Sequence, residues 1–190
     1  MDLRIFILDP KINQHARLTL ITGPVRSGKT RLAVQWALTF PTPRAYIATA
    51  QSLDSEMSER IRRHQEERGS SFQTYEEPLA LNFRLEKIRE GFSVVVVDCL
   101  TLWTNNLLGA MGEDEQGIQK ISDEFLTVLK RMETPVILIG NEVGWGIVPE
   151  NALARTFRDL SGLLLQEIAR IADQVILMVA GIPLIVKGKG

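Results

Sequence analysis

The fold of this chain is decided by Gly23-Pro24-Val25-Arg26-Ser27-Gly28-Lys29-Thr30. The stretch fits the pattern G-x-x-x-x-G-K-[ST] of the phosphate-binding loop, or P-loop, whose glycines let backbone N–H groups turn toward an anion. In such a loop the lysine reaches the β- and γ-phosphates of a nucleotide, and the final hydroxyl meets Mg²⁺. The stretch therefore predicts a nucleoside triphosphate site, with Lys29 in a catalytic role and Thr30 as a metal ligand.

The segments on either side of this loop support that prediction. Residues 18–22 form an apolar, β-branched run that is typical of a buried strand, and residues 31–38 place their apolar side chains at helical spacing. Strand, loop and helix thus follow one another in the order that a P-loop requires. The motif indicates which ligand binds and leaves the reaction open.

Length and composition favour one α/β domain. The chain has 190 residues, of which 45% are hydrophobic and 24% charged, an ordinary globular composition with enough apolar residues for a sizeable core. The formal net charge is -1 at pH 7, so the chain as a whole does not attract polyanions. We therefore expect no nucleic-acid partner.

Cysteine content and apolar runs bear on the compartment. The single cysteine, Cys99, excludes an internal disulfide and a cysteine-only zinc site, as expected for a protein of the reducing cytosol. No apolar run reaches the roughly 18 residues of a membrane span, and no signal peptide opens the sequence. The expected location is the cytoplasm, with no membrane span.

Strand-like and helix-like segments alternate along the chain, which predicts a mostly parallel sheet covered by helices on both faces. We expect a P-loop NTPase-like (RecA-like) domain over residues 18–190, preceded by an N-terminal extension, 1–17, with a possible edge strand at 3–8. A last strand at 184–187, after a turn at Gly181-Ile182-Pro183, is expected to pair antiparallel. The other expected strands are 44–49, 72–75, 93–98, 135–140 and 173–179. The other expected helices are 52–68, 79–90, one from 113 onward and 151–172, and residues 99–108 are expected to form a helix or an extended turn.

Asp98 ends the apolar strand predicted at 93–98. A carboxylate at this position is the second element of a P-loop site, where it stands beside Mg²⁺ or the water around it. Asp98 could instead cap the helix predicted to follow, and the two roles are compatible. We predict a metal-binding role for Asp98 together with Thr30.

His64 lies on a predicted helix whose other residues are mostly charged. Such charge is usually a solvated surface, and a lone histidine on it is commonly an ordinary surface residue. However, Arg60, Arg62, Arg63 and Arg68 surround it with groups able to hold phosphates. The residues by themselves leave both interpretations of His64 open.

A glycine-punctuated loop, 141–151, follows the strand predicted at 135–140. Loops at this edge of an open parallel sheet are where ligands bind. Arg158 and Asp159, on the next helix, are expected either to pair with neighbouring side chains or to contact a ligand. The loop therefore belongs to the predicted site edge.

Several blocks in the chain together resemble one family, that of the bifunctional adenosylcobinamide kinase / adenosylcobinamide-phosphate guanylyltransferase of cobalamin biosynthesis. The likeness runs from Leu18 to about Lys187. Its marks are Thr22 to Thr30, Tyr46-Ile47-Ala48-Thr49, the group Asp54, Glu56, Met57, Arg60, Ile61 and His64, and the blocks Asn141-Glu142-Val143-Gly144, Gly146-Ile147-Val148-Pro149-Glu150-Asn151 and Phe157-Arg158-Asp159.

The resemblance implies two reactions on one scaffold. The first is phosphorylation of the aminopropanol hydroxyl of adenosylcobinamide by ATP or GTP, and the second is transfer of GMP from GTP to adenosylcobinamide phosphate with release of pyrophosphate. It also implies a covalent guanylyl-histidine at His64, Mg²⁺ as cofactor, and a homotrimer or other homo-oligomer. A neutral imidazole nitrogen can attack the α-phosphorus in line, which makes the role chemically reasonable.

The resemblance further implies which residues hold the nucleotide. Beside the P-loop, the segment Thr49-Ala50-Gln51 and the residues Gln65 and Arg68 would line the GTP site, and Glu76 and Asp98 would help to hold it. The chain has no N-K-x-D guanine motif, so Glu76 is a candidate to accept hydrogen bonds from guanine N1 and N2. Leu163-Leu164-Leu165 stand where a basic and asparagine-containing stretch is common in the family, and we expect them to serve subunit packing.

Two other functions compete with this prediction. A monofunctional small-molecule P-loop kinase would share the loop, and His64 would then be incidental. A RecA-like, nucleotide-dependent binding module acting on nucleic acid would also share it, but the neutral charge and the lack of a basic, aromatic-rich stripe count against that function.

Overall fold

The computed structural model describes residues 12–51, 59, 69–112 and 114–188. The strands are β1 (Leu18–Thr22), β2 (Ala45–Ala48), β3 (Gln73–Glu76), β4 (Val95–Asp98), β5 (Val136–Ile139), β6 (Gln174–Val179) and β7 (Ile182–Lys187). The helices are α1 (Lys29–Ala37), a 3₁₀ turn η1 (Gly69–Ser71), α3 (Leu81–Lys87), α4 (Leu100–Met111), α5 (Glu115–Arg131) and α6 (Ala152–Ile171). None of these helices combines the length and apolar character that crossing a bilayer requires.

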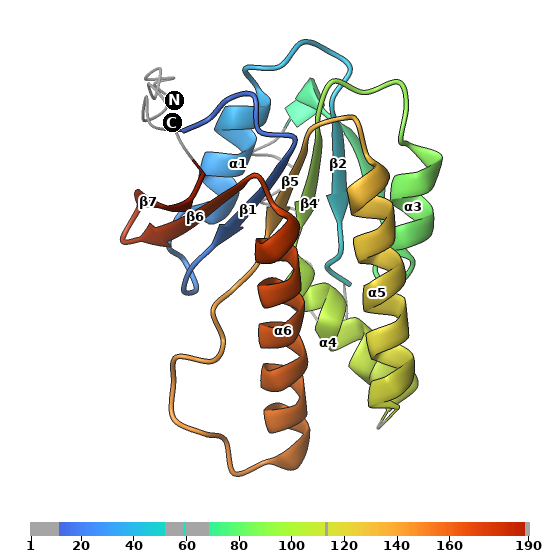
Figure 1. Cartoon of the computed structure of the whole chain (residues 1–190), viewed down its shortest axis with the longest axis vertical. Coiled ribbons are helices and arrows are strands. Elements are labelled where there is room, and N and C mark those ends of the chain that lie inside the picture. Colours follow the sequence, from blue (N-terminus) through green and yellow to red (C-terminus); the bar gives the residue numbers. More distant parts are fainter. Residues whose placement is uncertain (1–11, 52–58, 60–68, 113, 189–190) are drawn as a thin grey trace.

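The seven strands form one sheet in the order β3-β2-β4-β5-β1-β6-β7 (Figure 1). All neighbouring pairs are parallel except β6 with β7, which pair antiparallel. Parallel neighbours need crossover connections, and helices provide them. The predicted fold class is confirmed: a mostly parallel sheet with an antiparallel C-terminal strand.

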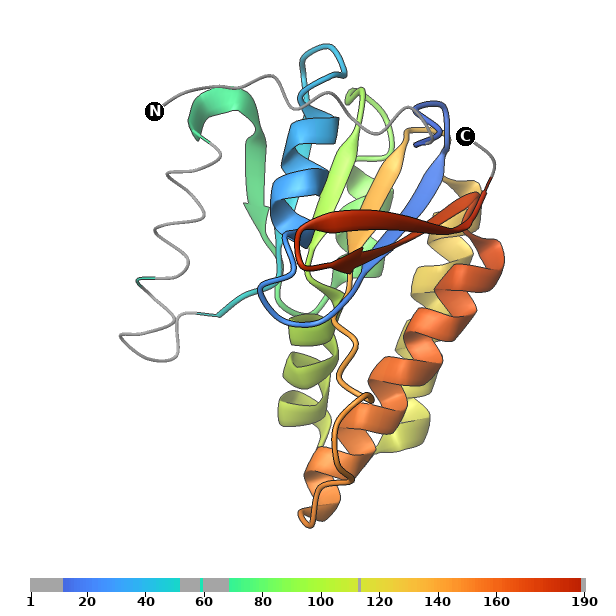
Figure 2. The ribbon, with the colours of Figure 1, turned by 90° about the vertical axis from the view of Figure 1, so that its left-hand side faces the viewer.

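The central strands bury both faces because helices cover both (Figures 1 and 2). In β4, Val95 and Val97 face the core under α3, α4, α5 and α6, while Val96 faces the core under α1. This is why the sequence of β4 is a continuous apolar run without polar alternation. Ile12, from the N-terminal extension, is 3% exposed and adds to the core on the α1 face.

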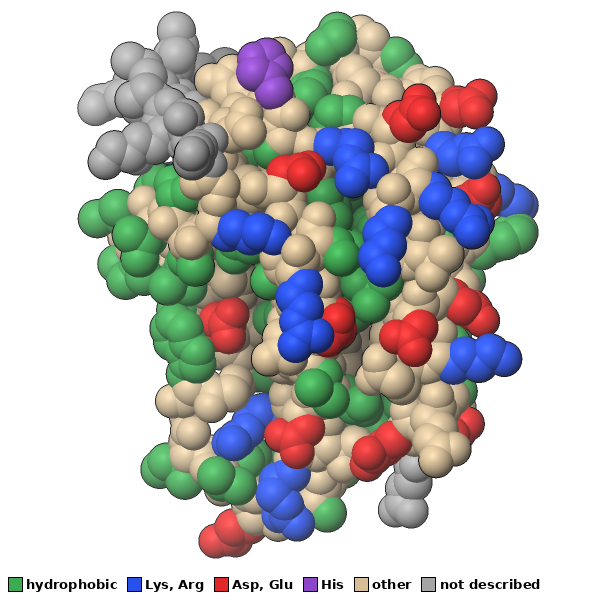
Figure 3. All heavy atoms as spheres, in the orientation of Figure 1, with side chains coloured by type: hydrophobic (Ala, Val, Ile, Leu, Met, Phe, Trp, Pro, Cys, Tyr) green, Lys and Arg blue, Asp and Glu red, His purple; other side chains and the backbone are tan. Residues whose placement is uncertain are grey.

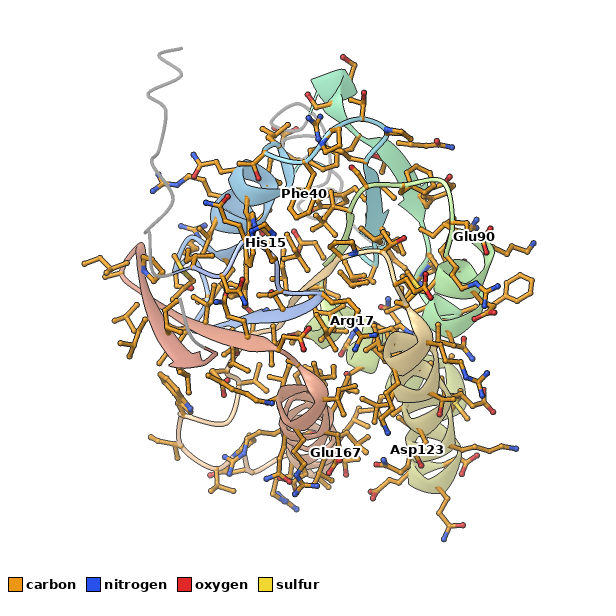
Figure 4. The ribbon with its side chains drawn as sticks, turned by 45° about the horizontal axis from the view of Figure 1, so that its top comes forward. His15, Arg17, Phe40, Glu90, Asp123 and Glu167 are labelled. Carbon is orange, nitrogen blue, oxygen red and sulfur yellow. The ribbon has the colours of Figure 1, made fainter. Side chains whose placement is uncertain are left out.

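Local polar groups fix the ends of several elements. Asp114 and Asn151 cap α5 and α6 by accepting the backbone N–H groups of Gly117 and Ala154, at 2.9 and 3.0 Å. Arg17, just before β1, donates to the carbonyl oxygens of Lys130 and Met132, at 3.1 and 2.8 Å. Figure 4 shows Arg17 between β1 and the end of α5, so the guanidinium joins them where helix carbonyls lack partners.

Some predicted boundaries differ from the structure. The turn predicted at 181–183 is present but ends earlier, at Gly181, because β7 already begins at Ile182 and contains Pro183 opposite Met178. An edge strand tolerates proline, since one side of it needs no ladder hydrogen bond. The helix predicted at 79–90 is shorter, Leu81–Lys87. The predicted edge strand at 3–8 and most of the predicted helix at 52–68 lie outside the described residues.

The interpretation of Leu163-Leu164-Leu165 as a subunit contact holds for one residue at most. Leu164 and Leu165 are buried in the core between α6 and the sheet, and Leu163 alone of the three is exposed. Successive helical residues point in different directions, so a run of three cannot all face one partner. Two of these leucines are core residues of the chain itself.

The packing of α4 against α5 yields a stability prediction. Phe125 is fully buried, and its ring lies 4.8 Å from that of Trp103, centroid to centroid. We expect Phe125→Ala to lower the free energy of unfolding by about 3–5 kcal/mol, because it removes apolar contacts and leaves a cavity. Phe83→Ala, at a position that is 58% exposed, should change it by less than about 0.5 kcal/mol. Urea unfolding followed by circular dichroism measures both, and equal losses would contradict the assigned core.

Candidate active site

The candidate site lies where the parallel strands β1, β2, β3, β4 and β5 end. The P-loop connects β1 to α1 at this edge, and the β6–β7 hairpin lies against it (Figure 2). The backbone N–H of Gly181, at the tip of the hairpin, donates to the carbonyl of Ser27 at 3.1 Å. The loop is therefore held from both the sheet and the hairpin, at the edge where open α/β sheets bind ligands.

Two glycines of the loop are required by its geometry. Gly23 has φ +143°, and a Cβ atom added to it would lie 2.5 Å from the carbonyl oxygen of Met178. Gly28, the residue before α1, has φ +94°. Any other residue would be strained at both positions and would clash at Gly23. These glycines let the chain turn tightly enough to aim the first N–H groups of α1 at an anion.

Lys29 is buried and bonds the loop itself. Its Nζ donates to the carbonyl oxygens of Gly23 and Pro24, at 3.0 and 2.7 Å, and lies 3.4 Å from Ser27 Oγ. Burial lowers the pKa of Lys29, and the nearby carboxylates of Asp98 and Glu142 oppose that shift. The ammonium group of Lys29 therefore lies inside the P-loop, bonded to the loop's own carbonyl oxygens.

Thr30 and Asp98 meet at the end of β4. Thr30 Oγ1 donates to Asp98 Oδ2 at 2.9 Å, and the phenol of Tyr46 on β2 donates to the same oxygen at 2.5 Å. Cys99 is the N-cap of α4, and no side chain caps that helix, so the alternative role of Asp98 as a helix cap is not observed. A hydroxyl beside a carboxylate is the oxygen donor type that Mg²⁺ prefers, and the pair fits that ion.

Glu142 reaches the P-loop from β5. Its Oε1 accepts the hydroxyl of Thr22 at 2.6 Å, and its backbone N–H donates to the carbonyl of Gly23 at 3.1 Å. The neighbouring Asn141 N–H donates to Thr101 Oγ1 at 2.7 Å. The first two residues of the loop 141–151 are therefore fixed between the P-loop and α4.

Thr49 closes the end of β2 against β4. Its hydroxyl donates to the carbonyl of Cys99 at 2.7 Å and accepts the Cys99 N–H at 2.8 Å. The Thr49 side chain is thus fully buried and faces the protein, while Ala50 and Gln51 are half-buried. Burial raises the pKa of the Cys99 thiol to about 12, which makes it an inert neutral group.

Glu76 lies at the far end of the same edge. It is the last residue of β3, opposite Ala48 on β2, and it is exposed. Four strand spacings separate β3 from β1, which corresponds to about 19 Å. The structure thus places Glu76 on the predicted edge but distant from the P-loop.

Some predicted site residues are outside the described part of the chain: His64, Gln65 and Arg68. Within residues 12–51, 69–112 and 114–188, no three or more His, Cys, Asp and Glu side chains gather as a metal cluster.

The sequence predictions missed the site contacts of Tyr46, Thr22 and Glu142. Glu142 could have been found from its position just after an apolar strand, where ligand-binding residues are common. The contact of Tyr46 could not, because it depends on which strands are neighbours in the sheet.

Solved structures similar to this chain include the RadB recombinase and the flagellar accessory protein FlaH from Methanocaldococcus jannaschii. RadB has 20% identity and a TM-score of 0.49, covering 85% of this chain and 74% of that one. FlaH has 15% identity and a TM-score of 0.49, covering 91% of this chain and 79% of that one.

Proteins found by sequence comparison share a higher sequence identity with this chain. The bifunctional adenosylcobalamin biosynthesis protein CobP of Pseudomonas aeruginosa is 41% identical over 170 residues, covering 90% of this chain and 97% of that protein. The bifunctional adenosylcobalamin biosynthesis protein CobU of Salmonella typhimurium is 37% identical over 182 residues, covering 90% and 99%. The family model described as cobinamide kinase / cobinamide phosphate guanyltransferase matches residues 19–186. This chain belongs to the cobinamide kinase / cobinamide phosphate guanyltransferase family.

Proposed function

We propose that one nucleotide site, built around the P-loop, serves both activities of the family in this chain. In the first reaction the aminopropanol hydroxyl of adenosylcobinamide takes the γ-phosphoryl group of ATP or GTP. In the second, GMP passes from GTP to adenosylcobinamide phosphate. The observation that carries the proposal is the convergence of Lys29, Thr30 and Asp98 at one edge of the sheet.

We expect Lys29 to exchange its hydrogen-bond partners when a triphosphate binds. Its Nζ now bonds two loop carbonyl oxygens. Phosphate oxygens carry full charge and form shorter and stronger hydrogen bonds with an ammonium than carbonyls do. We therefore expect Lys29 to turn from the loop to the β- and γ-phosphates, where it stabilises the charge that develops during phosphoryl transfer.

Thr30 and Asp98 are the residues that would hold Mg²⁺. Bound there, the ion would neutralise charge on the β- and γ-phosphate oxygens. The chain's own contribution is orientation: the phenol of Tyr46 fixes Asp98 Oδ2 from β2 while Thr30 reaches it from α1. A carboxylate held by two donors keeps one geometry, which P-loop catalysis depends on.

For guanylyl transfer we propose His64 as the nucleophile. An imidazole nitrogen would attack the α-phosphorus of GTP, forming an N–P bond while the P–O bond to the β-phosphate breaks and pyrophosphate leaves with the electron pair. A phosphate oxygen of adenosylcobinamide phosphate would then attack the same phosphorus and release the imidazole. The proposal is supported by the family membership and by the arginines adjacent to His64 in the sequence.

Covalent labelling tests this step. Wild type incubated with GTP labelled at the α-phosphate should carry acid-labile, base-stable label, because a phosphoramidate has that stability. His64→Ala should carry no label. A chase with adenosylcobinamide phosphate should move the label from the wild-type protein into a small-molecule product.

The matched control is His15→Ala, which removes the other of the two histidines. His15 is exposed on the N-terminal extension, so this variant should label like wild type. Unlabelled wild type that still phosphorylates adenosylcobinamide would favour the monofunctional kinase. Nucleotide turnover that responds to DNA and ignores adenosylcobinamide would contradict the proposed function altogether.

Guanine recognition is assigned to Glu76. Its position at the carboxyl end of β3, distant from the P-loop, supports this role, because the base of a nucleotide would lie away from its phosphates. A carboxylate can accept from both N1–H and N2–H of guanine, whereas an amide presents a donor to one of them. We expect Glu76→Gln to reduce the preference for GTP over ATP in nucleotide competition by about tenfold or more, the effect of roughly 1.4 kcal/mol. Unchanged preference would remove Glu76 from this role.

We also propose that the chain forms a homo-oligomer, a homotrimer or another closed assembly. Figure 3 shows hydrophobic side chains gathered on the side formed by β7 and the segment after β5. On β7 the alternate residues Ile182, Leu184 and Val186 are exposed, and Ile147 on the loop 141–151 is 96% exposed. An apolar strip of this kind on a soluble domain is typical of a protein interface. We assign it to a second copy of this chain.

Light scattering after size exclusion tests this assignment. We expect wild type to elute with the mass of an oligomer and Leu184→Glu to shift toward the monomer, because a charge would be buried without a partner. Phe83→Glu is the control, since Phe83 is similarly exposed on α3, away from this strip. A monomeric wild type would refute the assembly, and an oligomeric Leu184→Glu would refute this interface.

A further inference from the structure

Glu142 is held against the phosphate loop by two independent hydrogen bonds. Its Oε1 accepts the hydroxyl of Thr22, and its backbone N–H donates to the carbonyl of Gly23. The same Gly23 oxygen accepts Lys29 Nζ at 3.0 Å. Glu142 and Lys29 are therefore neighbours through one shared acceptor, at the loop position from which the lysine reaches the β- and γ-phosphates.

The second carboxylate oxygen of Glu142 is the one that a substrate could reach. No described residue hydrogen-bonds Oε2, while Oε1 is fixed by Thr22. The side chain is half-buried, so one oxygen is anchored and the other stays available to a ligand. A carboxylate that is fixed through one oxygen can accept a substrate proton on the other oxygen, as a general base does.

Asp98 is the other acidic group that contacts the P-loop among the described residues, and it is the one proposed above to hold Mg²⁺. Asp98 Oδ2 accepts from both Thr30 and Tyr46. The residue after Asp98 is Cys99, which is buried against Thr49. Because a bound cation would engage the charge of Asp98, Glu142 is the one of these two carboxylates that is left to take a proton from the substrate.

We propose that Glu142 is the general base of the kinase reaction, a role that rests on the proposed function. The substrate hydroxyl gives its proton to Glu142 Oε2 as its oxygen forms a bond to the γ-phosphorus. The bond from that phosphorus to the β–γ bridging oxygen breaks, and the nucleoside diphosphate leaves with the electron pair. Guanylyl transfer does not use Glu142, because a phosphate acceptor has no hydroxyl proton to lose.

Measuring both reactions distinguishes a general base from a structural residue, because a structural defect would slow both reactions. We expect Glu142→Gln to lower kcat for phosphorylation of adenosylcobinamide by about 10²–10⁴-fold, the usual contribution of a general base. Guanylyl transfer from α-labelled GTP to supplied adenosylcobinamide phosphate should stay within about threefold of wild type, a difference of about 0.7 kcal/mol. Glutamine keeps the size and the hydrogen bond from Thr22 but accepts protons poorly.

Glu133→Gln is the matched control. Glu133 is exposed just before β5, at the opposite edge of the sheet from Glu142, and the substitution makes the same charge change. It should leave both reactions unchanged. Loss of both reactions in Glu142→Gln, or of neither, would overturn the general-base role. Wild type that fails to phosphorylate adenosylcobinamide would instead overturn the proposed function.

Thr22 should act as a positioning residue for Glu142. Thr22→Val removes the hydroxyl while keeping the shape, and we expect kcat for the kinase reaction to fall by about tenfold with little change in KM. Thr22→Ser restores the donor and should recover most of the rate. An equal loss in the valine and serine variants would show that packing at β1, and not the hydrogen bond to Glu142, matters at this position.

Discussion

The carbonyl oxygen of Gly23 accepts two N–H groups, one from Lys29 and one from Glu142, and the site depends on this shared acceptor. It joins the end of β1 and the start of α1 to the segment after β5, which is distant from both in the sequence. A Cβ at Gly23 would clash with the Met178 carbonyl, so the close approach of β6 also requires a glycine there. One backbone position therefore sets the relative placement of Lys29, the proposed catalytic cation, of Glu142, the proposed base, and of the C-terminal hairpin.

The elements could be predicted from sequence because local signals decide them. The apolar run of β4 is typical of a strand buried on both faces, and Asp98 at its end follows from the P-loop pattern. The order of the strands in the sheet could not be predicted in this way, because β5 lies between β1 and β4 although it comes after both in the chain. The contact of Tyr46 with Asp98 exists because β2 pairs with β4, a long-range choice that no local pattern encodes.

The wrong predictions arose in the same way, because long-range packing overrode a local sequence signal. Pro183 favoured a turn by local propensity, but β7 is an edge strand, where the missing N–H is tolerated. The run Leu163-Leu164-Leu165 suggested an interface, but helix geometry turns two of these side chains into the core. In both cases tertiary position, which the sequence does not display locally, overrode a sound local preference.

One loop can serve two reactions if the acceptors approach from opposite ends of the triphosphate. Glu142 and Thr22 lie at the β1–β5 side, where Lys29 would hold the γ-phosphate, so the hydroxyl acceptor would enter there. Glu76 lies on β3, about 19 Å across the edge, which would direct the base away from that side. The α-phosphate would then lie between them, toward β2 and β3, and in the sequence His64, the proposed nucleophile, lies in the segment that connects those two strands. A nucleotide bound in one orientation would thus present its γ-phosphorus to one acceptor and its α-phosphorus to the other, with no need for the loop to rearrange.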